Sequence, residues 1–141
     1  MEKSYKDLEV YRRAFALLKP VHDLVLRFPD YEKYDLCNQM RRASKSVPSV
    51  IAEGYARNRS PKEFCSYLSQ ALGSANEMEV HFEVARELGY IGQEDYEHFV
   101  GEYRIVGKQL TRLIQYWRSR ESQSTQQQPP VTIHHSPGDQ T

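Results

Sequence analysis

The chain has 141 residues, of which 39% are hydrophobic and 27% are charged, and its 19 basic side chains equal its 19 acidic side chains in number. This length and composition predict a single soluble domain with a substantial hydrophobic core. No apolar run reaches the roughly 20 residues that a membrane-spanning helix requires, and the N-terminal residues lack the apolar segment of a secretory signal.

The first predicted element is a helix over residues 7–27. Its apolar face comprises Leu8, Tyr11, Phe15, Leu18 and Val25. Pro20 lies inside this helix and should bend it, because proline lacks an amide hydrogen and its ring crowds the carbonyl group four residues earlier. The following residues 28–31, which include Pro29 and Asp30, are typical of a turn and end the element.

The second predicted helix ends near Arg57 and contains Pro48. Its apolar seam advances in steps of three and four residues, through Leu36, Met40, Ala43, Val47, Val50 and Gly54. Because Pro48 removes the hydrogen bond to the carbonyl group of Ser44, we expect one kinked helix. The hydroxyl groups of Ser44, Ser46 and Ser49 are expected to satisfy part of the freed hydrogen-bonding capacity.

A helix start is the clearest local signal in the sequence. Ser60 is placed to accept a hydrogen bond from the amide of Glu63, while the Glu63 carboxylate is placed to accept one from the amide of Ser60. Pro61 occupies the first helical position, where its missing amide hydrogen costs nothing. The helix that follows carries an apolar seam of Phe64, Leu68, Ala71, Ala75, Met78, Phe82 and Ala85. Gly89 is suited to end it in a left-handed conformation.

The last predicted helix begins near Gln93, and its apolar face comprises Tyr96, Phe99, Tyr103, Val106, Leu110, Leu113 and Trp117. Four helices joined by short links predict an all-α, up-down-up-down four-helix bundle over residues 1–120. A helix-turn-helix domain with extra helices is the alternative, and it would need shorter helices. Residues 121–141 are rich in Gln, Ser, Thr and Pro and predict a disordered C-terminal tail.

Charge is strongly segregated along the neutral chain. Residues 37–62 carry six basic and one acidic side chain, residues 63–103 one basic and nine acidic, and residues 104–120 five basic and none acidic. In an up-down bundle one pole then collects basic side chains, namely Arg57, Arg59, Lys62, Arg112, Arg118 and Arg120. The opposite pole collects Glu77, Glu79, Glu83, Glu87, Glu94, Asp95 and Glu97. The basic pole is a candidate phosphate-binding surface.

A second basic cluster, Arg41, Arg42 and Lys45, lies toward the acidic pole of the predicted bundle. These side chains could pair with the glutamates there, within one subunit or across a subunit boundary, which is the more common role of a charge run. The functional alternative is a phosphate-binding surface that is made of the basic pole and supported by nearby tyrosines.

Three residues in the helix interiors suggest structural roles. Glu53 precedes Arg57 by four residues, the favoured order for an ion pair along a helix. Gly54 and Gly73 lie in helix interiors, where each costs about 1 kcal/mol relative to alanine. Close approach of the second and third helices is the expected compensation.

The sequence gives no pattern for catalysis or for a cofactor. Glu77 and His81 are four residues apart, but the chain has no Glu-x-x-His motif of the kind that di-metal bundles use. It also contains no glycine-rich phosphate loop, nucleophile elbow or His-Glu-x-x-His motif. We expect Cys37 and Cys65 to be reduced, buried thiols in a cytoplasmic protein. No metal, cofactor or small-molecule substrate is therefore expected, and no enzymatic activity.

Dispersed motifs in the sequence resemble those of the 23S rRNA-intervening sequence protein family, small bacterial four-helix bundles. The resemblance covers roughly residues 5–118. It is carried by Gln39-Met40-Arg41-Arg42-Ala43, Val47-Pro48 and Ile51-Ala52-Glu53-Gly54, with support from Asp7-Leu8-Glu9-Val10, Ala71-Leu72-Gly73-Ser74, Glu77 and Leu88-Gly89-Tyr90. It implies a protomer that assembles into a ring, typically a homopentamer. A related branch, the accessory proteins of diversity-generating retroelements, binds nucleic acid together with a reverse transcriptase.

Two hypotheses for function follow from these observations. The first is a ring-forming adaptor that binds RNA or single-stranded DNA through the basic pole. The second is an assembly protein whose charges serve only contacts between subunits and with a protein partner. Under the second hypothesis the residues at the contacts are those of the motif: Gln39, Arg41, Arg42, Lys45, Pro48, Glu53, Gly54, Gly73 and Glu77.

Overall fold

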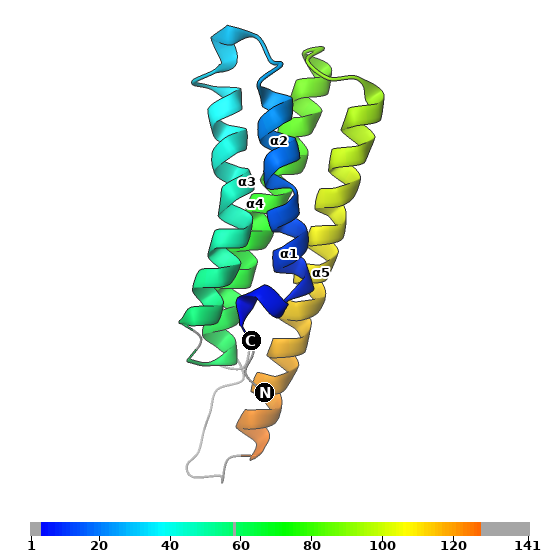
Figure 1. The fold of residues 1–141 in the computed structure, drawn as a ribbon. Helices are drawn as coiled ribbons and strands as arrows, with labels where there is room; N and C mark the ends of the chain where they lie inside the picture. The colour runs from blue at the N-terminus through cyan, green and yellow to red at the C-terminus, as the bar shows by residue number, and fades with distance from the viewer. Residues whose placement is uncertain (1–3, 58, 128–141) are drawn as a thin grey trace.

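The computed structural model of the chain describes residues 4–57 and 59–127, and within these ranges it is helical and has no β-strand. The helices are α1 (Glu9–Ala16), α2 (Leu18–Val25), α3 (Leu36–Ala56), α4 (Pro61–Glu87) and α5 (Gln93–Gln127), with 3₁₀ turns at Tyr5–Asp7 and Asp30–Glu32. Because α1 and α2 together form the first rod, the fold is the predicted up-down-up-down four-helix bundle (Figure 1).

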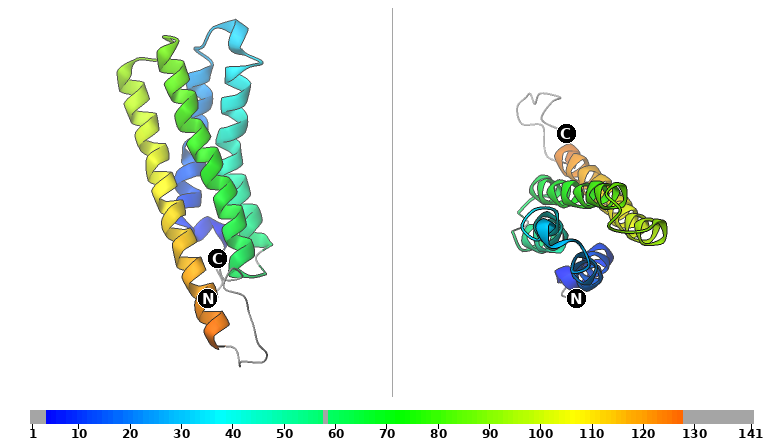
Figure 2. Two further views of the ribbon diagram at one scale, coloured as in Figure 1. Left: turned by 180° about the vertical axis from the view of Figure 1, so that it is seen from behind. Right: turned by 90° about the horizontal axis from the view of Figure 1, so that it is seen from above.

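The rods are arranged so that α4 packs along both α3 and α5, while α1 and α2 lie against α3 and α1 also meets α5. Seen from above, the four rods surround a common core (Figure 2). One pole holds the α2–α3 and α4–α5 connections, and the other holds the α3–α4 connection and the C-terminal end of α5 (Figure 1). The connections therefore lie at the poles that were assumed when the basic and acidic side chains were assigned to opposite ends of the bundle.

The first rod breaks at Leu17, three residues before the proline that was expected to bend it. Pro20 cannot donate to the carbonyl group of Ala16, and its ring crowds that group. The ladder changes pattern at this point, since the Leu17 amide donates to Ala14 at 3.2 Å. The bend therefore falls one turn before the proline. The helix itself begins at Glu9, after a separate capped turn, rather than at residue 7.

Helix α3 runs through Pro48 without interruption, as expected. The neighbouring hydroxyl groups do not serve the carbonyl group that the proline frees. Ser44 donates instead to the carbonyl oxygen of Arg41 at 3.0 Å, and Ser49 donates to that of Ser46 at 3.3 Å. The hydroxyl group of Ser46 bonds to that of Ser74 at 2.9 Å, which ties α3 to α4.

Helix α4 starts and ends close to the predicted positions. The Ser60 hydroxyl accepts from the Glu63 amide at 3.1 Å, but the Glu63 carboxylate accepts from the amide of Arg59 at 3.0 Å rather than from that of Ser60. The reciprocal bond thus reaches one residue farther back than a standard capping box. At the other end, Gly89 has φ +80°, the left-handed conformation predicted for it.

The core is formed by the seams predicted for α3, α4 and α5, but the face predicted for the first rod is wrong. Phe15 is 54% exposed and, of that predicted face, only Val25 is buried. The first rod instead buries Val10, Ala14, Leu17, Val21 and Leu24, because the break at Leu17 shifts the helical spacing between α1 and α2.

All of the apolar positions predicted for α4 are buried, and so are Phe99, Tyr103, Val106 and Leu110 of α5. Phe82 stacks on Phe99, with ring centroids 5.0 Å apart. Both cysteines are free and buried, and burial raises the pKa of each thiol, so neither is an activated nucleophile.

Helix α5 continues past the predicted domain boundary at residue 120 and ends at Gln127. A helix that has already formed can be extended by residues that have no apolar face, because the free-energy cost of helix nucleation does not recur. Glutamate and glutamine are good helix formers, and the extension projects beyond the other rods (Figure 1). The rest of the predicted tail, residues 128–141, lies outside the described residues.

Candidate nucleic-acid interface

Helix α5 carries an exposed row of side chains spaced four residues apart, here called the α5 stripe. It consists of Arg104, Lys108, Arg112, Tyr116 and Arg120. At a rise of about 1.5 Å per residue, the stretch from Lys108 to Arg120 spans about 18 Å of the helix. The stripe therefore presents a line of positive charge long enough to meet several phosphate groups of an extended strand.

The α5 stripe is electrostatically unfavourable for the isolated helix. Like charges four residues apart destabilise a helix by about 0.2–0.5 kcal/mol per pair. Arg104 is offset by Glu79 of α4, whose carboxylate lies 3.3 Å from its Nε atom. Lys108, Arg112 and Arg120 form no ion pair with an acidic side chain among the described residues. An anionic ligand would relieve this repulsion.

Near the C-terminal end of the α5 stripe, aromatic rings lie beside a positively charged side chain. Tyr116 is 51% exposed, and its ring meets that of Trp117 edge to face at 5.3 Å. The guanidinium group of Arg120 lies 5.3 Å from the centre of the Tyr116 ring. Trp117 is half-buried and is held by Phe64 of α4 at 5.7 Å. An exposed ring beside a guanidinium group is a suitable platform for an unpaired base.

A groove between α4 and α5 runs beside the stripe. One cavity in it, of about 430 Å³, is lined by Arg104, Lys108 and Arg112 together with the carboxylate of Glu79 and uncharged residues such as Asn76 and Thr111. A second cavity, of about 150 Å³, lies nearer the basic pole and is lined by Lys62, Cys65, Ser66, Ser69, Arg118 and Glu121. The structure thus brings Lys62 and Arg118 together across this groove.

The other predicted basic residues are more dispersed. Arg57 forms the predicted ion pair with Glu53 at 3.6 Å, which offsets its charge. Arg59 is exposed at the start of α4, and its amide is held by Glu63. Arg112 lies along α5 rather than at the pole, where it lines the larger cavity. The candidate surface is therefore a strip along α5 and its groove, rather than the cap of the bundle.

The sequence reasoning missed Lys108 and Tyr116. Their signal was present, since residues 104, 108, 112, 116 and 120 repeat at four-residue spacing, which makes each a neighbour of the next on the helix surface. Each step turns about 40° around the axis, so the row winds along the solvent-exposed side of the helix. The apolar seam of α5 identified the face that is buried. The opposite face would have shown the same row of basic and aromatic side chains.

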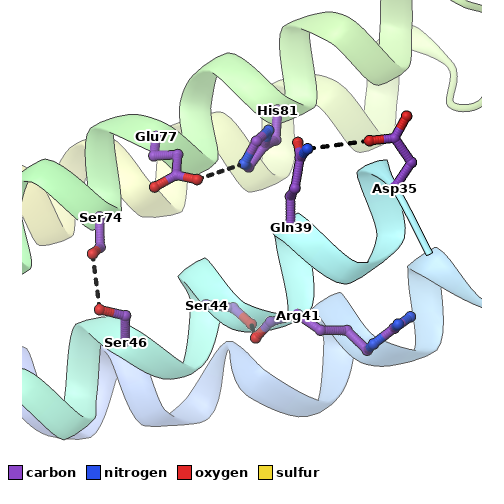
Figure 3. Close-up of polar contacts among 8 residues, drawn as sticks. All are labelled: Asp35, Gln39, Arg41, Ser44, Ser46, Ser74, Glu77 and His81. Atoms are coloured by element: carbon purple, nitrogen blue, oxygen red, sulfur yellow. Dashed lines mark hydrogen bonds and ion pairs between the residues drawn. The ribbon is translucent and has the colours of Figure 1, made fainter. Parts of the chain in front are cut away.

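The motif residues meet at a different surface, a groove between α3 and α4 of about 380 Å³. Its lining comprises Asn38, Gln39, Arg42, Ala43, Ser46, Ser74 and Glu77. In Figure 3 Gln39 points from α3 toward α4, while Ser46 and Ser74 bond across the groove. The Gln39 amide group donates to Asp35 at 3.2 Å. Glu77 bonds to the ring of His81 at 3.0 Å, and that ring is buried.

Arg41 and Lys45 are not part of this α3–α4 groove. Arg41 points away from it and donates to the carbonyl oxygen of Lys33 at 3.0 Å (Figure 3). Lys45 is exposed. Neither they nor Arg42 form an ion pair with a glutamate among the described residues, so the predicted pairing within one subunit is not found.

The remaining motif residues have structural roles, with one correction. A Cβ atom on Gly54 would collide with Cβ of Tyr67 and would lie 2.8 Å from Cγ of that ring, which confirms the predicted close approach of α3 and α4. Gly73 is different, because a Cβ atom there would meet nothing within 4 Å. The prediction of a tight contact at Gly73 is wrong, since this residue is exposed. Pro48 is buried within α3.

The described residues contain no group of three or more His, Cys, Asp and Glu side chains arranged to hold a metal ion. Glu77 and His81 form a pair without a third ligand. No described helix is long and apolar enough to cross a membrane.

A family profile described as 23S rRNA-intervening sequence protein matches residues 6–112. The chain belongs to this family. The family description names no enzymatic activity. The fold is also similar to that of a crystal structure from Bacteroides thetaiotaomicron, a protein of unknown function from the S23 ribosomal protein family, with a TM-score of 0.68 and 24% identity. That similarity covers 75% of this chain and 95% of the other, and it supports the fold alone. No curated protein matches the chain.

Proposed function

We propose that this family member is a non-catalytic protein that binds single-stranded RNA or DNA along the α5 stripe and assembles into a ring of identical subunits, in keeping with the predicted homopentamer. The single observation that carries the proposal is the row of Lys108, Arg112 and Arg120, which winds along the solvent-exposed side of α5 with Tyr116 between the two arginines. Cations supply affinity for phosphate groups, and the exposed ring supplies a surface for a base.

A single strand suits this surface better than a duplex. Sequence-tolerant single-strand binding combines a basic groove with exposed aromatic rings, and Tyr116 and the α4–α5 groove provide both. A ring of subunits would repeat the α5 stripe, so that weak contacts at each copy would combine through avidity.

The experiment compares two variants of equal charge change. The test variant is Lys108→Gln, Arg112→Gln and Arg120→Gln, and the matched control is Lys19→Gln, Arg27→Gln and Lys33→Gln, which removes three cations from another part of the surface. Binding to a labelled single-stranded RNA and to a single-stranded DNA should fall at least about ten-fold in the test variant and stay near the wild-type value in the control. Equal losses in both variants would show that the α5 stripe has no special role.

A second candidate function is an assembly protein with no nucleic-acid ligand. The observation in its favour is a row of exposed apolar side chains, Val80 and Val84 on α4 and Leu88 directly after it, with exposed fractions of 54%, 38% and 53%. Such rows commonly mark contacts between proteins. If this candidate is correct, replacing Val80 and Val84 with serine should dissociate the oligomer into subunits. The wild-type protein should then bind no nucleic acid, even at low salt.

A further inference from the structure

The α3–α4 groove has polar side chains on its two walls that are free to bond to a ligand. Arg42 and Asn38 line it from α3, and neither side chain has a hydrogen-bond partner among the described residues. Glu77 lines it from α4, with one carboxylate oxygen bonded to His81 and the other without a partner in the described chain. The volume of about 380 Å³ lies within the roughly 300–1,000 Å³ of small-molecule sites.

The charges on the walls restrict what this groove can bind. Arg42 offers a planar fork of N–H donors, whereas Glu77 offers a carboxylate that only accepts. A phosphate group would meet the Arg42 fork but would be repelled by the Glu77 carboxylate. The groove is therefore suited to a neutral ligand that presents two adjacent acceptors toward α3 and donors toward α4.

We propose that the α3–α4 groove binds the guanine base. Guanine carries the O6 and N7 acceptors on one edge, which match the fork of Arg42, and this is the commonest specific contact between arginine and a base. Its N1–H and N2–H₂ donors lie on the adjoining edge, where Glu77 can accept them. The inference rests on the proposed function for the source of the base, which is a nucleotide of the bound single strand. Unpaired bases are read on these two edges in single-stranded RNA.

Other bases fit the pattern less well. Adenine presents an amino group beside N7, so one N–H of the Arg42 fork would face a donor instead of an acceptor. Uracil lacks the pair of donors that Glu77 accepts. Cytosine has one amino group for Glu77 and is the nearest competitor, so it is included in the test.

The test uses free nucleosides, because they carry no phosphate for the α5 stripe to bind. Titration calorimetry of the full-length protein should detect guanosine and show a preference of roughly ten-fold or more over adenosine, cytidine and uridine. 7-Deazaguanosine, which lacks the N7 acceptor, and inosine, which lacks the N2 amino group, should each bind more weakly than guanosine. Equal binding of all the nucleosides, or no binding of guanosine, would overturn the proposal.

Substitutions in the walls of the α3–α4 groove test whether guanosine binds there. Arg42→Lys keeps the charge but loses the fork, so it should weaken guanosine binding about ten-fold, and Glu77→Gln should weaken it as well. Arg41→Lys is the matched control, because Arg41 points away from the groove (Figure 3). Unchanged binding in Arg42→Lys would overturn the assignment. Dissociation of the oligomer by Arg42→Lys, seen by light scattering, would overturn it as well, since Arg42 would then be an assembly contact.

The two proposals fail in different ways. If oligonucleotides lose affinity in the Lys108, Arg112 and Arg120 variant but guanosine does not bind, the guanine site is wrong and the α5 stripe stands. If guanosine binds and oligonucleotides do not, the groove takes a free nucleoside or nucleotide, and the strand-binding function is wrong. A preference for guanine-containing oligonucleotides that Arg42→Lys removes, with affinity for oligouridine unchanged, supports both.

Discussion

The hydroxyl group of Tyr90 donates a 2.6 Å hydrogen bond to the buried carboxylate of Glu32. This contact joins the α2–α3 connection to the α4–α5 connection at one pole of the bundle. The same carboxylate accepts from the amide of Leu36 at 3.2 Å and so supports the first turn of α3. Since α3 carries one wall of the α3–α4 groove, Glu32 and Tyr90 help to fix the position of that wall.

Tyr90→Phe should destabilise the protein, because Glu32 would lose its strongest donor while remaining buried. Urea denaturation should show a lower midpoint with an unchanged slope. The control is Tyr31→Phe, whose hydroxyl lies 3.3 Å from that of Tyr90 but which is 76% exposed. We expect little change in that variant. Equal midpoints for wild type and Tyr90→Phe would show that the contact is structurally neutral.

Tyr103→Phe should maintain or raise stability at neutral pH. The Tyr103 hydroxyl is buried in the core and has no hydrogen-bond partner among the described residues. Removing it relieves a desolvation cost that is on the order of 1–3 kcal/mol for such a group. Thermal denaturation of the two proteins at pH 7 measures the difference, and a clear loss of stability in the variant would contradict the prediction.

Because of the buried Tyr103 phenol, we expect the stability of the protein to depend on pH in the alkaline range. Burial raises the pKa of Tyr103 above its usual value, so the folded state holds this proton more tightly than the unfolded state. Below the unfolded pKa of about 10 the hydroxyl is neutral in both states, and as pH rises above that value the unfolded state ionises first and stability falls. Tyr103→Phe should therefore lose less stability than wild type above about pH 10. Parallel stability curves for the two proteins would rule this out.

The glycines at positions 54 and 73 should respond to alanine in opposite directions. Gly54→Ala forces the new Cβ atom into the side chain of Tyr67 and should cost on the order of 1–3 kcal/mol. Gly73→Ala meets nothing within 4 Å and should stabilise the helix by up to about 1 kcal/mol. Urea denaturation of both variants tests the pair. A stable Gly54→Ala protein would mean that α3 and α4 can separate at little cost.

Tyr116→Ala tests the aromatic part of the α5 stripe. Loss of a stacked base costs about 1–3 kcal/mol of binding free energy in comparable sites, and this cost is only weakly dependent on salt. Fluorescence anisotropy with a labelled oligonucleotide measures the loss. Tyr34→Ala is the control, because Tyr34 is also exposed, at 82%, but lies in the α2–α3 connection. Equal effects of the two variants would remove Tyr116 from the binding surface.

Much of the fold could be predicted from the sequence because the apolar seams of α3, α4 and α5 have unbroken helical spacing. The face of the first rod could not, because its spacing is broken at Leu17. The start of α4 at Ser60-Pro61 and the left-handed Gly89 were also correct, since both depend on local backbone chemistry. The bend expected from Pro20 was also found, as the break at Leu17. It falls one turn before the proline because the proline acts on the carbonyl group four residues before it.

The candidate site was less accessible to sequence reasoning, because it depends on which way each side chain faces. Gly54 and Gly73 carry the same local signal, yet only Gly54 meets a neighbouring helix. Arg41 and Arg42 are adjacent, but only Arg42 lines the α3–α4 groove. The buried carboxylate of Glu32 had no signal in the sequence, since its partner Tyr90 lies 58 residues away.

The most direct test of the account is the salt dependence of nucleic-acid binding. Fluorescence anisotropy of the oligomeric protein with a labelled single-stranded RNA should give an affinity that falls steeply with salt. The slope for the Lys108, Arg112 and Arg120 variant should be shallower by about 2, because single-strand contacts contribute about 0.7 each. Flat anisotropy at low salt, from a sample that light scattering shows to be intact, would contradict nucleic-acid binding. A slope equal to that of wild type would contradict the role of the α5 stripe.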